Sequence, residues 1–197
     1  MKILLNGIKQ GFFLITILFF SCNNLPKTEI KNDNFILKYP LGWNITTVST
    51  TGSINFQLFN ITNGSSKNPI SLNIIVFDNN DIIQIDSLES KTKHFIFEYR
   101  KVADPSTLKY LNLSDTDIVF NPIKFKEIDA IKWSKRETTI SSTNGRKPVK
   151  SDLIQNAIAY PCNDNLIIVQ YQFDNDQSKD SKDTIQKILD NFSPSCK

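Results

Sequence analysis

Few residues in this chain could carry out catalysis or bind a metal. His94 is the only histidine, and a histidine with no cysteine or second ligand nearby in the sequence does not predict a metal site. A Ser-His-Asp site would depend on the same histidine, and the sequence contains neither a Gly-x-Ser-x-Gly turn nor a cysteine placed as a nucleophile. We therefore expect no metal, no cofactor and no catalytic residue, with His94 half-exposed on a helix.

Three carboxylates are the remaining candidates for catalytic residues. Glu127, Asp129 and Glu137 lie close together in the sequence. Paired carboxylates in one cleft could serve as the acid and the base of a hydrolase. The sequence does not show whether these three share a cleft, so a hydrolase is kept as the alternative function.

Basic residues gather in one part of the chain, residues 124–150, which we call the basic segment. It has eight Lys or Arg and three acidic residues, whereas the whole chain has 23 basic and 20 acidic residues. One interpretation is a solvated sheet edge, where lysines guard against aggregation. The other is a surface that contacts anionic lipid headgroups or an acidic partner. The residues assigned to this candidate surface are Lys124, Lys126, Lys132, Arg136, Arg146 and Lys147.

The N-terminus has the pattern of an export signal. Lys2 and Lys9 precede an apolar run that extends from Phe12 to Phe20 and is followed by Ser21 and Cys22. A positive start, a short apolar stretch and a small residue are typical of a secretory signal, and the run is too short for a membrane-spanning helix of about 20 residues. Ser21-Cys22 resembles the lipobox of exported bacterial lipoproteins, in which the cysteine thiol takes a diacylglycerol and the freed amine is commonly acylated.

The lipobox resemblance implies that residues 1–21 are removed and that Cys22 carries the lipid. The protein would then belong to the bacterial cell envelope, on the periplasmic side or the outer surface, and would be anchored in the bilayer through Cys22. The alternatives are a secreted protein without a lipid and a signal that is retained as a helix. Without its signal the chain has a net charge of about +1, which argues against nucleic-acid binding, because phosphate contacts need a surplus of Lys and Arg. Residues 22–34 lack apolar periodicity and contain Pro26, so we expect a tether there.

The remaining residues, 35–197, predict a single domain of the α+β class. Alternating apolar residues predict strands at 35–39 and 54–61. A more continuous apolar run predicts a strand at 70–77 that is covered on both faces and forms a hairpin with the strand at 54–61. Helical spacing predicts helices at 86–100, capped by Asp86 or Ser87, and at 178–192. Strands near 123–125, 131–133, 149–160 and 166–173 would form an antiparallel meander with turns at 144–145 and 163–165. This order predicts a central antiparallel β-sheet with helices packed on it.

Cys162 and Cys196 are the cysteines that remain once Cys22 is lipidated, and the envelope compartment oxidises thiols. The strand at 166–173 advances about 26 Å at ~3.3 Å per residue, and the helix that follows returns about 21 Å at ~1.5 Å per residue. Because the two displacements nearly cancel, the end of the helix should lie over the start of the strand. We therefore predict a Cys162–Cys196 disulfide, with two separate thiols as the alternative.

The two ends of the predicted domain resemble PsbP-like proteins, a group of extrinsic photosystem II proteins and bacterial relatives that are often lipoproteins. The segments are Phe35-x-x-x-Tyr39-Pro40-x-Gly42-Trp43 and Ile188-Leu189-x-x-Phe192. The resemblance implies an α/β/α sandwich around a central antiparallel sheet. It also implies no enzyme, because the family consists mostly of assembly factors and binding modules.

Together these patterns favour a non-catalytic envelope lipoprotein that binds a partner or supports an assembly through its sheet face. The partner would be an unknown protein or an anionic component of the envelope. The alternative is an envelope enzyme that uses the three carboxylates. A concave pocket lined by polar groups would help to discriminate between these functions.

Overall fold

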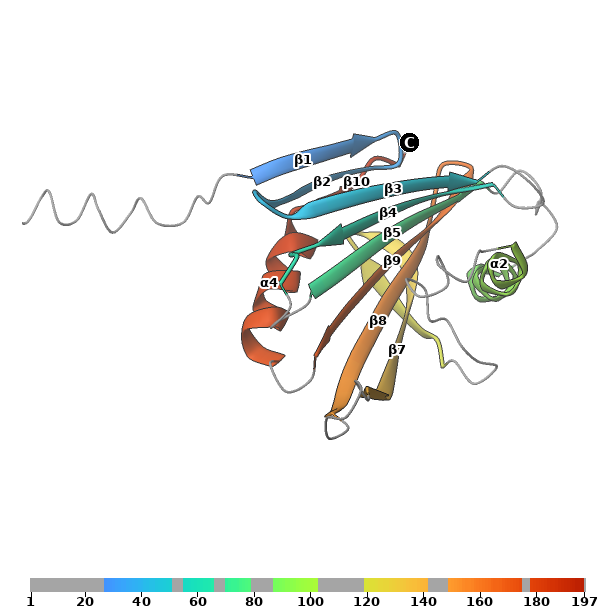
Figure 1. Ribbon diagram of the computed structural model, residues 1–197. Helices are drawn as coiled ribbons and strands as arrows, with labels where there is room; N and C mark the ends of the chain where they lie inside the picture. The colour runs from blue at the N-terminus through green and yellow to red at the C-terminus, as the bar shows by residue number, and fades with distance from the viewer. Residues whose placement is uncertain are drawn as a thin grey trace, which may run out of the picture.

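The computed structural model describes residues 27–50, 55–65, 70–78, 87–102, 119–141, 149–174 and 178–196. The strands in these ranges are β1 (Lys27–Asn32), β2 (Phe35–Pro40), β3 (Asn44–Thr50), β4 (Phe56–Thr62), β5 (Ile70–Asp78), β6 (Asn121–Phe125), β7 (Ile128–Ser141), β8 (Val149–Cys162), β9 (Asn165–Asp174) and β10 (Phe192–Pro194). The helices are α2 (Leu88–Val102) and α4 (Ser178–Asp190). Seven strands form an antiparallel sheet in the order β3-β4-β5-β9-β8-β7-β6, and three form a second sheet in the order β1-β2-β10 (Figure 1).

The seven-stranded sheet consists of two antiparallel meanders joined side by side. Strands β3 to β5 form the first, β6 to β9 form the second, and β5 pairs with β9. The predicted hairpin at 54–77 and the predicted meander are therefore confirmed. Positive φ angles at Lys126 (50°) and Glu127 (67°) make the tight turn between β6 and β7, and Asn163 (54°) makes the turn between β8 and β9. The predicted turn at 144–145 lies outside the described residues.

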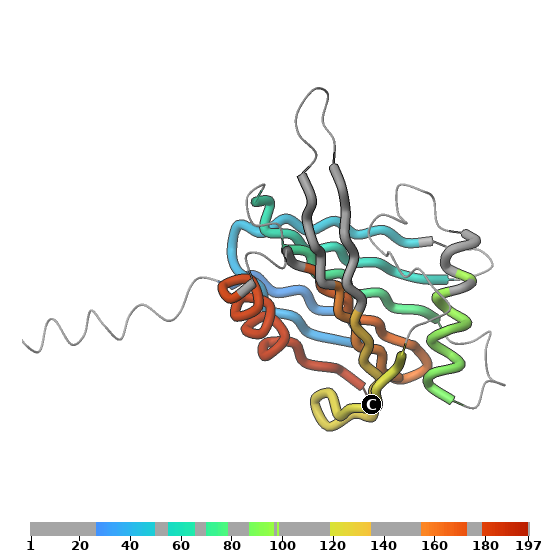
Figure 2. The backbone as a smooth tube through the Cα atoms, turned by 90° about the horizontal axis from the view of Figure 1, so that it is seen from below, coloured from blue at the N-terminus to red at the C-terminus, as the bar shows by residue number. Residues whose placement is uncertain are grey.

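The seven-stranded sheet is apolar on both faces, because successive residues of its central strands point to opposite sides. In β5, Ile74 and Val76 belong to one core, whereas Ile75 and Phe77 belong to the other. We call the first side the α4 face, because α4 and the three-stranded sheet cover it. The second side is the α2 face, where Phe95 of α2 packs on the sheet. The two helices thus lie on opposite faces (Figures 1 and 2).

Aromatic packing holds the three-stranded sheet against the larger one. The ring of Phe35 in β2 lies 5.3 Å from Phe59 of β4 and 5.5 Å from Phe192 of β10, measured between centroids. Phe192 also lies 5.7 Å from Phe125 of β6. All four rings are buried. Burying an aromatic ring stabilises the folded state by about 2 kcal/mol, so this cluster is a main contact between the layers.

The N-terminal half of the domain departs from the prediction in one place. Residues 27–32 form β1, which pairs with β2 along its whole length, so the tether predicted for 22–34 is wrong for its second half. The side chains of β1 alternate between exposed and half-buried, but Ile30 is the only large apolar one. A strand with this composition shows no apolar periodicity, and pairing with β2 is what orders it.

The C-terminal helix also ends earlier than predicted. The prediction extended it to residue 192, whereas α4 ends at Asp190 and Phe192–Pro194 form β10 against β2. The antiparallel sheet with helices packed on it is confirmed. The α/β/α sandwich is not, because β1, β2 and β10 share the α4 face with a single helix, and the described fold is a β-rich sandwich.

Candidate functional site

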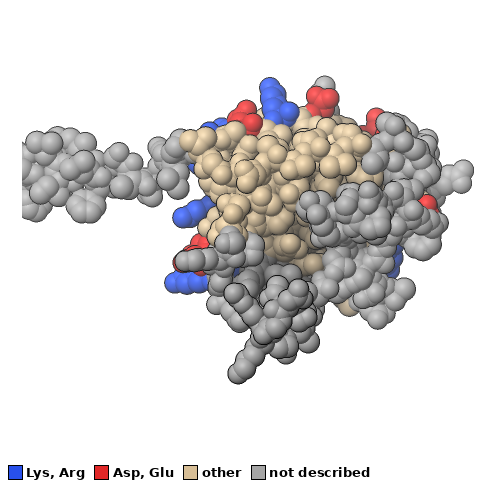
Figure 3. All heavy atoms as spheres, viewed as in Figure 1, with Lys and Arg blue, Asp and Glu red and all other residues tan. Residues whose placement is uncertain are grey.

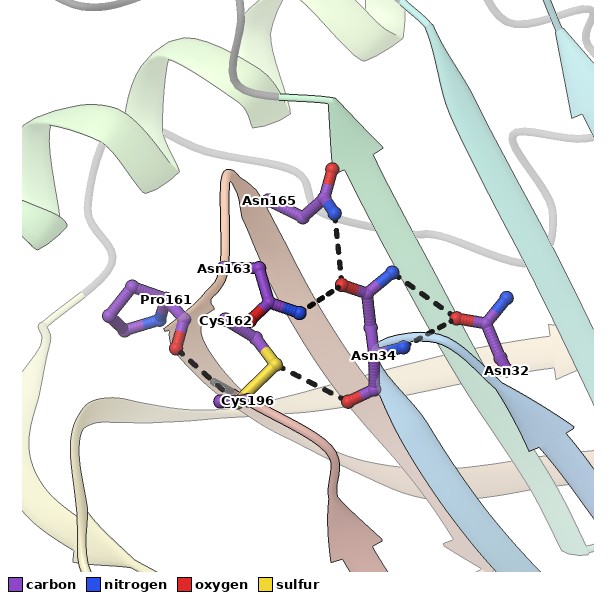
Figure 4. The surroundings of a disulfide bond; sticks show 7 residues. All are labelled: Asn32, Asn34, Pro161, Cys162, Asn163, Asn165 and Cys196. Atoms are coloured by element: carbon purple, nitrogen blue, oxygen red, sulfur yellow. Dashed lines mark hydrogen bonds between the residues drawn. A yellow bond between two sulfur atoms is a disulfide. The ribbon is translucent and has the colours of Figure 1, made fainter.

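The predicted disulfide is present in the structure. Cys162, at the end of β8, is bonded to Cys196, just beyond β10, and their Cα atoms lie 4.8 Å apart (Figure 4). Cys162 is buried, and its Sγ lies 3.3 Å from the backbone oxygen of Asn34. The bond ties the C-terminal end of the chain to the turn between β8 and β9. Cys22 and the predicted signal peptide, residues 1–21, lie outside the described residues.

Asn34 organises the surroundings of this disulfide. It is buried in the turn between β1 and β2, and its Oδ1 accepts hydrogen bonds from Asn165 Nδ2 at 2.9 Å and from Asn163 Nδ2 at 3.5 Å (Figure 4). Its own Nδ2 donates to Asn32 Oδ1 at 3.2 Å. The backbone nitrogen of Ser195 donates to the backbone oxygen of Asn34 at 2.9 Å. Three distant parts of the chain therefore meet at one buried residue, through its side chain and its backbone oxygen, which indicates a structural role for this region.

Two lysines of the basic segment contact groups within the protein. Lys124 Nζ lies 2.7 Å from Asp129 Oδ1, across the β6–β7 hairpin. Lys126 Nζ donates to the backbone oxygen of Asp190, the last residue of α4, at 3.0 Å. A lysine at that position satisfies a free carbonyl at the helix terminus and complements the helix dipole. Lys126 thus has a structural explanation that the sequence did not reveal.

The described lysines of the basic segment do not form one surface. Lys124 alternates with Ile123 and Phe125, whose side chains pack on the α4 face, so Lys124 lies on the α2 face. Lys132 pairs with Ile158, which belongs to the α4 face. Phe125 pairs with Ile128 across a two-residue turn, so the odd-numbered residues of β6 point to the same face as the even-numbered residues of β7. Lys124 and Lys132 therefore lie on opposite faces of the sheet. The side chain of Arg136 is not described, and Arg146 and Lys147 lie outside the described residues.

The carboxylates of the alternative function do not meet in a described cleft. Glu127 lies in the β6–β7 turn, and the side chain of Asp129 is 86% exposed in its ion pair with Lys124. Glu137 is in β7, where its side chain is not described. His94 is half-buried on α2 beside Phe95, with 6.1 Å between ring centroids, as expected for a helical histidine. Among the described residues, no three His, Cys, Asp or Glu side chains gather as metal ligands do.

A groove lies between α4 and strands β8 and β9, and we call it the α4 groove. Its volume is about 350 Å³, at the lower end of the range for small-molecule sites. It is lined by Asn156 and Tyr171 from the sheet and by Lys182, Asp183, Ile185, Gln186 and Leu189 from the helix. The lining residues from α4 recur at spacings of three and four, which places them along one side of the helix.

The α4 groove combines an apolar floor with a polar rim. Tyr171, Ile185 and Leu189 are buried in the core, and burial raises the pKa of the Tyr171 phenol above its usual value. The hydroxyl therefore stays protonated at neutral pH and can donate a hydrogen bond. Asn156 is fixed by the Ser134 hydroxyl, which donates to its Oδ1 at 2.8 Å. The groove can hold an apolar group and offer polar contacts to it.

The lining of the α4 groove does not provide a nucleophile paired with a base. The rim carries one lysine and one carboxylate, Lys182 and Asp183, which are adjacent and exposed on α4. Their charges balance, so the groove does not select strongly for anions or cations. This arrangement suits binding better than catalysis.

Sequence reasoning missed the α4 groove. One signal was present: Asn156 is a polar residue at an inward position of β8, in line with Ile158 and Tyr160, which both belong to the core. A polar residue in an apolar row often marks a site. The position of α4 over this residue depends on tertiary packing, which one sequence does not show.

Comparisons with known proteins add little. No protein-family model matches this chain, and no curated protein matches it. Among solved structures the chain is similar to LpqN, described as involved in cell envelope biogenesis of Mycobacterium tuberculosis. The identity is 15% and the TM-score 0.40, over 87% of this chain and 92% of that chain. At that level of similarity we assign neither fold nor function from it. In the part of the chain that the structure describes, no helix is both long and apolar enough to cross a membrane.

Proposed function

We propose that this protein is a lipid-anchored lipoprotein of the bacterial cell envelope that binds a partner without catalysing a reaction. The α4 groove carries the binding part of this proposal, because its apolar floor and polar rim are the features of a small-molecule site. The exposed position of Glu127 and Asp129 removes support from the alternative hydrolase. The lipobox pattern at Ser21-Cys22 carries the localisation.

The disulfide supports the same compartment. Stable disulfide bonds form in oxidising environments such as the periplasm and the cell surface, and they are rare in the cytosol. Cys162 and Cys196 are joined in the folded domain, and Cys22 is the one cysteine outside that pair. This use of cysteines fits an exported protein whose remaining cysteine is reserved for lipid.

The PsbP-like resemblance is part of the proposal, and its two segments lie together in the fold. Phe35 begins β2 and Phe192 begins β10, and the two strands pair as their rings stack. The residues that carry the resemblance therefore form one packing unit. A packing unit supports a shared architecture and gives no information about a ligand.

Fractionation of cells tests the anchor. We expect the full chain in the membrane fraction and the Cys22→Ser variant in the soluble envelope fraction, because the variant lacks the acylated thiol. Ser21→Thr serves as a matched control that keeps the cysteine. Membrane retention of Cys22→Ser would contradict the anchor.

Site-specific photo-cross-linking tests the α4 groove. Gln186 on its rim is replaced by p-benzoylphenylalanine, and Lys187, exposed on the same helix but outside the groove, is replaced in a second variant. After irradiation of intact cells, we expect an adduct from position 186 that position 187 does not give. Equal adducts from both positions, or none from either, would contradict binding in the groove.

An anionic envelope component would contact the basic segment instead of the groove. This second partner class is tested with vesicles that contain anionic lipid and a domain released by Cys22→Ser. Binding at low salt that is lost as salt rises would support it, because screening weakens contacts between exposed charges. Binding that does not depend on salt would contradict it.

A further inference from the structure

Three of the four outer edges of the two sheets carry features that discourage pairing with another strand. Natural sheets guard their edges with charged side chains, with proline or by keeping the edge strand short. Edge strand β1 carries Lys27, Glu29 and Lys31, β6 carries Pro122 and Lys124, and β10 has only three residues and ends at Pro194.

The fourth edge, β3, has none of these features. Its seven residues, Asn44–Thr50, include no charged residue, no proline and no glycine, and five of them are β-branched Ile, Thr or Val. Among the described strands β3 pairs only with β4, so no described strand occupies its other backbone edge. Figure 2 shows β3 at the margin of the seven-stranded sheet. Such a strand is a template for further pairing.

Apolar residues are exposed beside the same edge. Of the large hydrophobic residues exposed in the described part of the chain, Leu41 (64%) and Ile45 (40%) lie at β3, whereas Val119 (73%) precedes β6 at the opposite edge. Leu41 lies in the turn before β3, and Ile45 is its second residue. Figure 3 shows uncharged surface over this part of the molecule, with charged side chains around it. Exposed apolar residues at an unguarded strand edge indicate an interaction surface.

We propose that β3 pairs with β3 of a second copy of this chain, so that the two seven-stranded sheets join into one. The pairing is antiparallel about a two-fold axis perpendicular to the sheet, which makes the interface the same patch on both copies. Alignment of all seven residues places Thr47 opposite Thr47, Ile45 opposite Ser49 and Thr46 opposite Val48. Cross-strand pairs of β-branched residues and Thr–Thr pairs stabilise a sheet.

The absence of charge on β3 indicates that its partner is β3 of a second copy. In a symmetric antiparallel pair each residue faces a residue of the same strand, so a charge at the centre would face itself and repel. β3 has no such charge, and its exposed side chains are Ile45 and the uncharged hydrogen-bonding groups of Asn44, Thr46, Thr47 and Ser49. A strand built to recognise a different protein would gain specificity from charges complementary to its partner. β3 offers none, whereas it is complementary to itself.

Cysteine cross-linking in cell envelopes tests both the contact and its register. The Thr47→Cys variant of the full chain should form a disulfide-linked dimer on mild oxidation, because the two Cβ atoms face each other. Asn44→Cys should not, since the two Asn44 residues would lie about 20 Å apart at ~3.3 Å per residue, beyond the ~7 Å between Cα atoms that a disulfide spans. Asn121→Cys, on the opposite edge strand β6, is the matched control.

A charge at the centre of β3 should abolish the contact. Thr47→Lys places two ammonium groups opposite each other, and we expect dimer formation to weaken about ten-fold or more. Asn121→Lys adds the same charge on β6 and should leave the dimer intact. Circular dichroism checks that both variants remain folded.

Three results would overturn the proposal. One is a Thr47→Cys protein that stays monomeric under oxidation. Another is equal cross-linking of Asn44→Cys and Thr47→Cys, which would indicate random collision. The third is cross-linking of Thr47→Cys to a different protein, which would make β3 a site for a foreign strand.

Discussion

Tyr160 is the largest fully buried side chain in the described core, and its hydroxyl has no hydrogen-bond partner there. Burial raises the pKa of its phenol far above the usual value of 10.0. An unpaired buried hydroxyl costs free energy, so we expect Tyr160→Phe to raise the free energy of unfolding by about 1 kcal/mol in urea titrations. A destabilised variant would show instead that the hydroxyl has a partner.

Tyr160 also makes the free energy of unfolding depend on pH. The folded state resists ionisation of Tyr160, whereas the unfolded chain ionises it near pH 10, so the free energy of unfolding should fall as the pH rises above about 10. In Tyr160→Phe, the free energy of unfolding should fall less over this pH range. Urea midpoints of both proteins between pH 8 and about 11 provide the measurement, and parallel curves would contradict the assignment.

The disulfide is the second residue-scale contribution to stability. Its cysteines are 34 residues apart, and closing a loop of that size in the unfolded chain gives about 3 to 4 kcal/mol. We expect Cys196→Ala to lower the free energy of unfolding by that amount. Cys162→Ala should cost more, because its side chain is also buried in the core. Equal stability of oxidised wild type and Cys196→Ala would contradict this prediction.

At the scale of single elements, Ser87 caps the start of α2. Its Oγ accepts a hydrogen bond from the backbone nitrogen of Ser90 at 3.1 Å, which satisfies one of the free donors at the helix start. Ser87→Ala should therefore cost about 1 kcal/mol, whereas Ser87→Asp should retain most of the stability because Asp caps as well. Urea unfolding measures both, and equal losses for Ala and Asp would exclude capping.

Elements with strong internal patterns could be predicted from the sequence. The strands predicted at 35–39 and 70–77 and the helix at 86–100 correspond to β2, β5 and α2 within two residues at each end. Each of these elements buries a face, and burial imposes the apolar period that sequence reasoning detects. Ser87 was one of the two residues proposed as the cap.

Three of the four edge strands could not be predicted. Strands β1, β3 and β10 form because a neighbour offers backbone partners, and their own side chains show little apolar alternation. In β3 the described side chains are exposed except for half-buried Val48. For the candidate site, the cysteine pair followed from chain length and compartment. The α4 groove did not, because it depends on how α4 sits on β8 and β9.

At the scale of the molecule, the two cores cannot separate. Strands β4, β5, β8 and β9 supply residues to both faces of the seven-stranded sheet, so loss of one core disorders the other. We therefore expect a single cooperative unfolding transition for the domain that the structure describes, which also tests the predicted single domain. Far-UV circular dichroism and tryptophan fluorescence should give the same midpoint, and two separated midpoints would contradict it.

The hairpin of β1 and β2 has a mechanical consequence. Its open end is the pair Lys27–Pro40, and Lys27 is the first described residue after the proposed lipid anchor. A load that pulls the preceding chain away from the sheet reaches that pair first, and the hydrogen bonds of β1 then break one after another. β2 is held on its other edge by β10, which the disulfide fastens to β8. Under tension β1 would separate from β2 before the other strands separate. The chain between the proposed anchor and the domain would then be longer, while the rest of the fold stays intact.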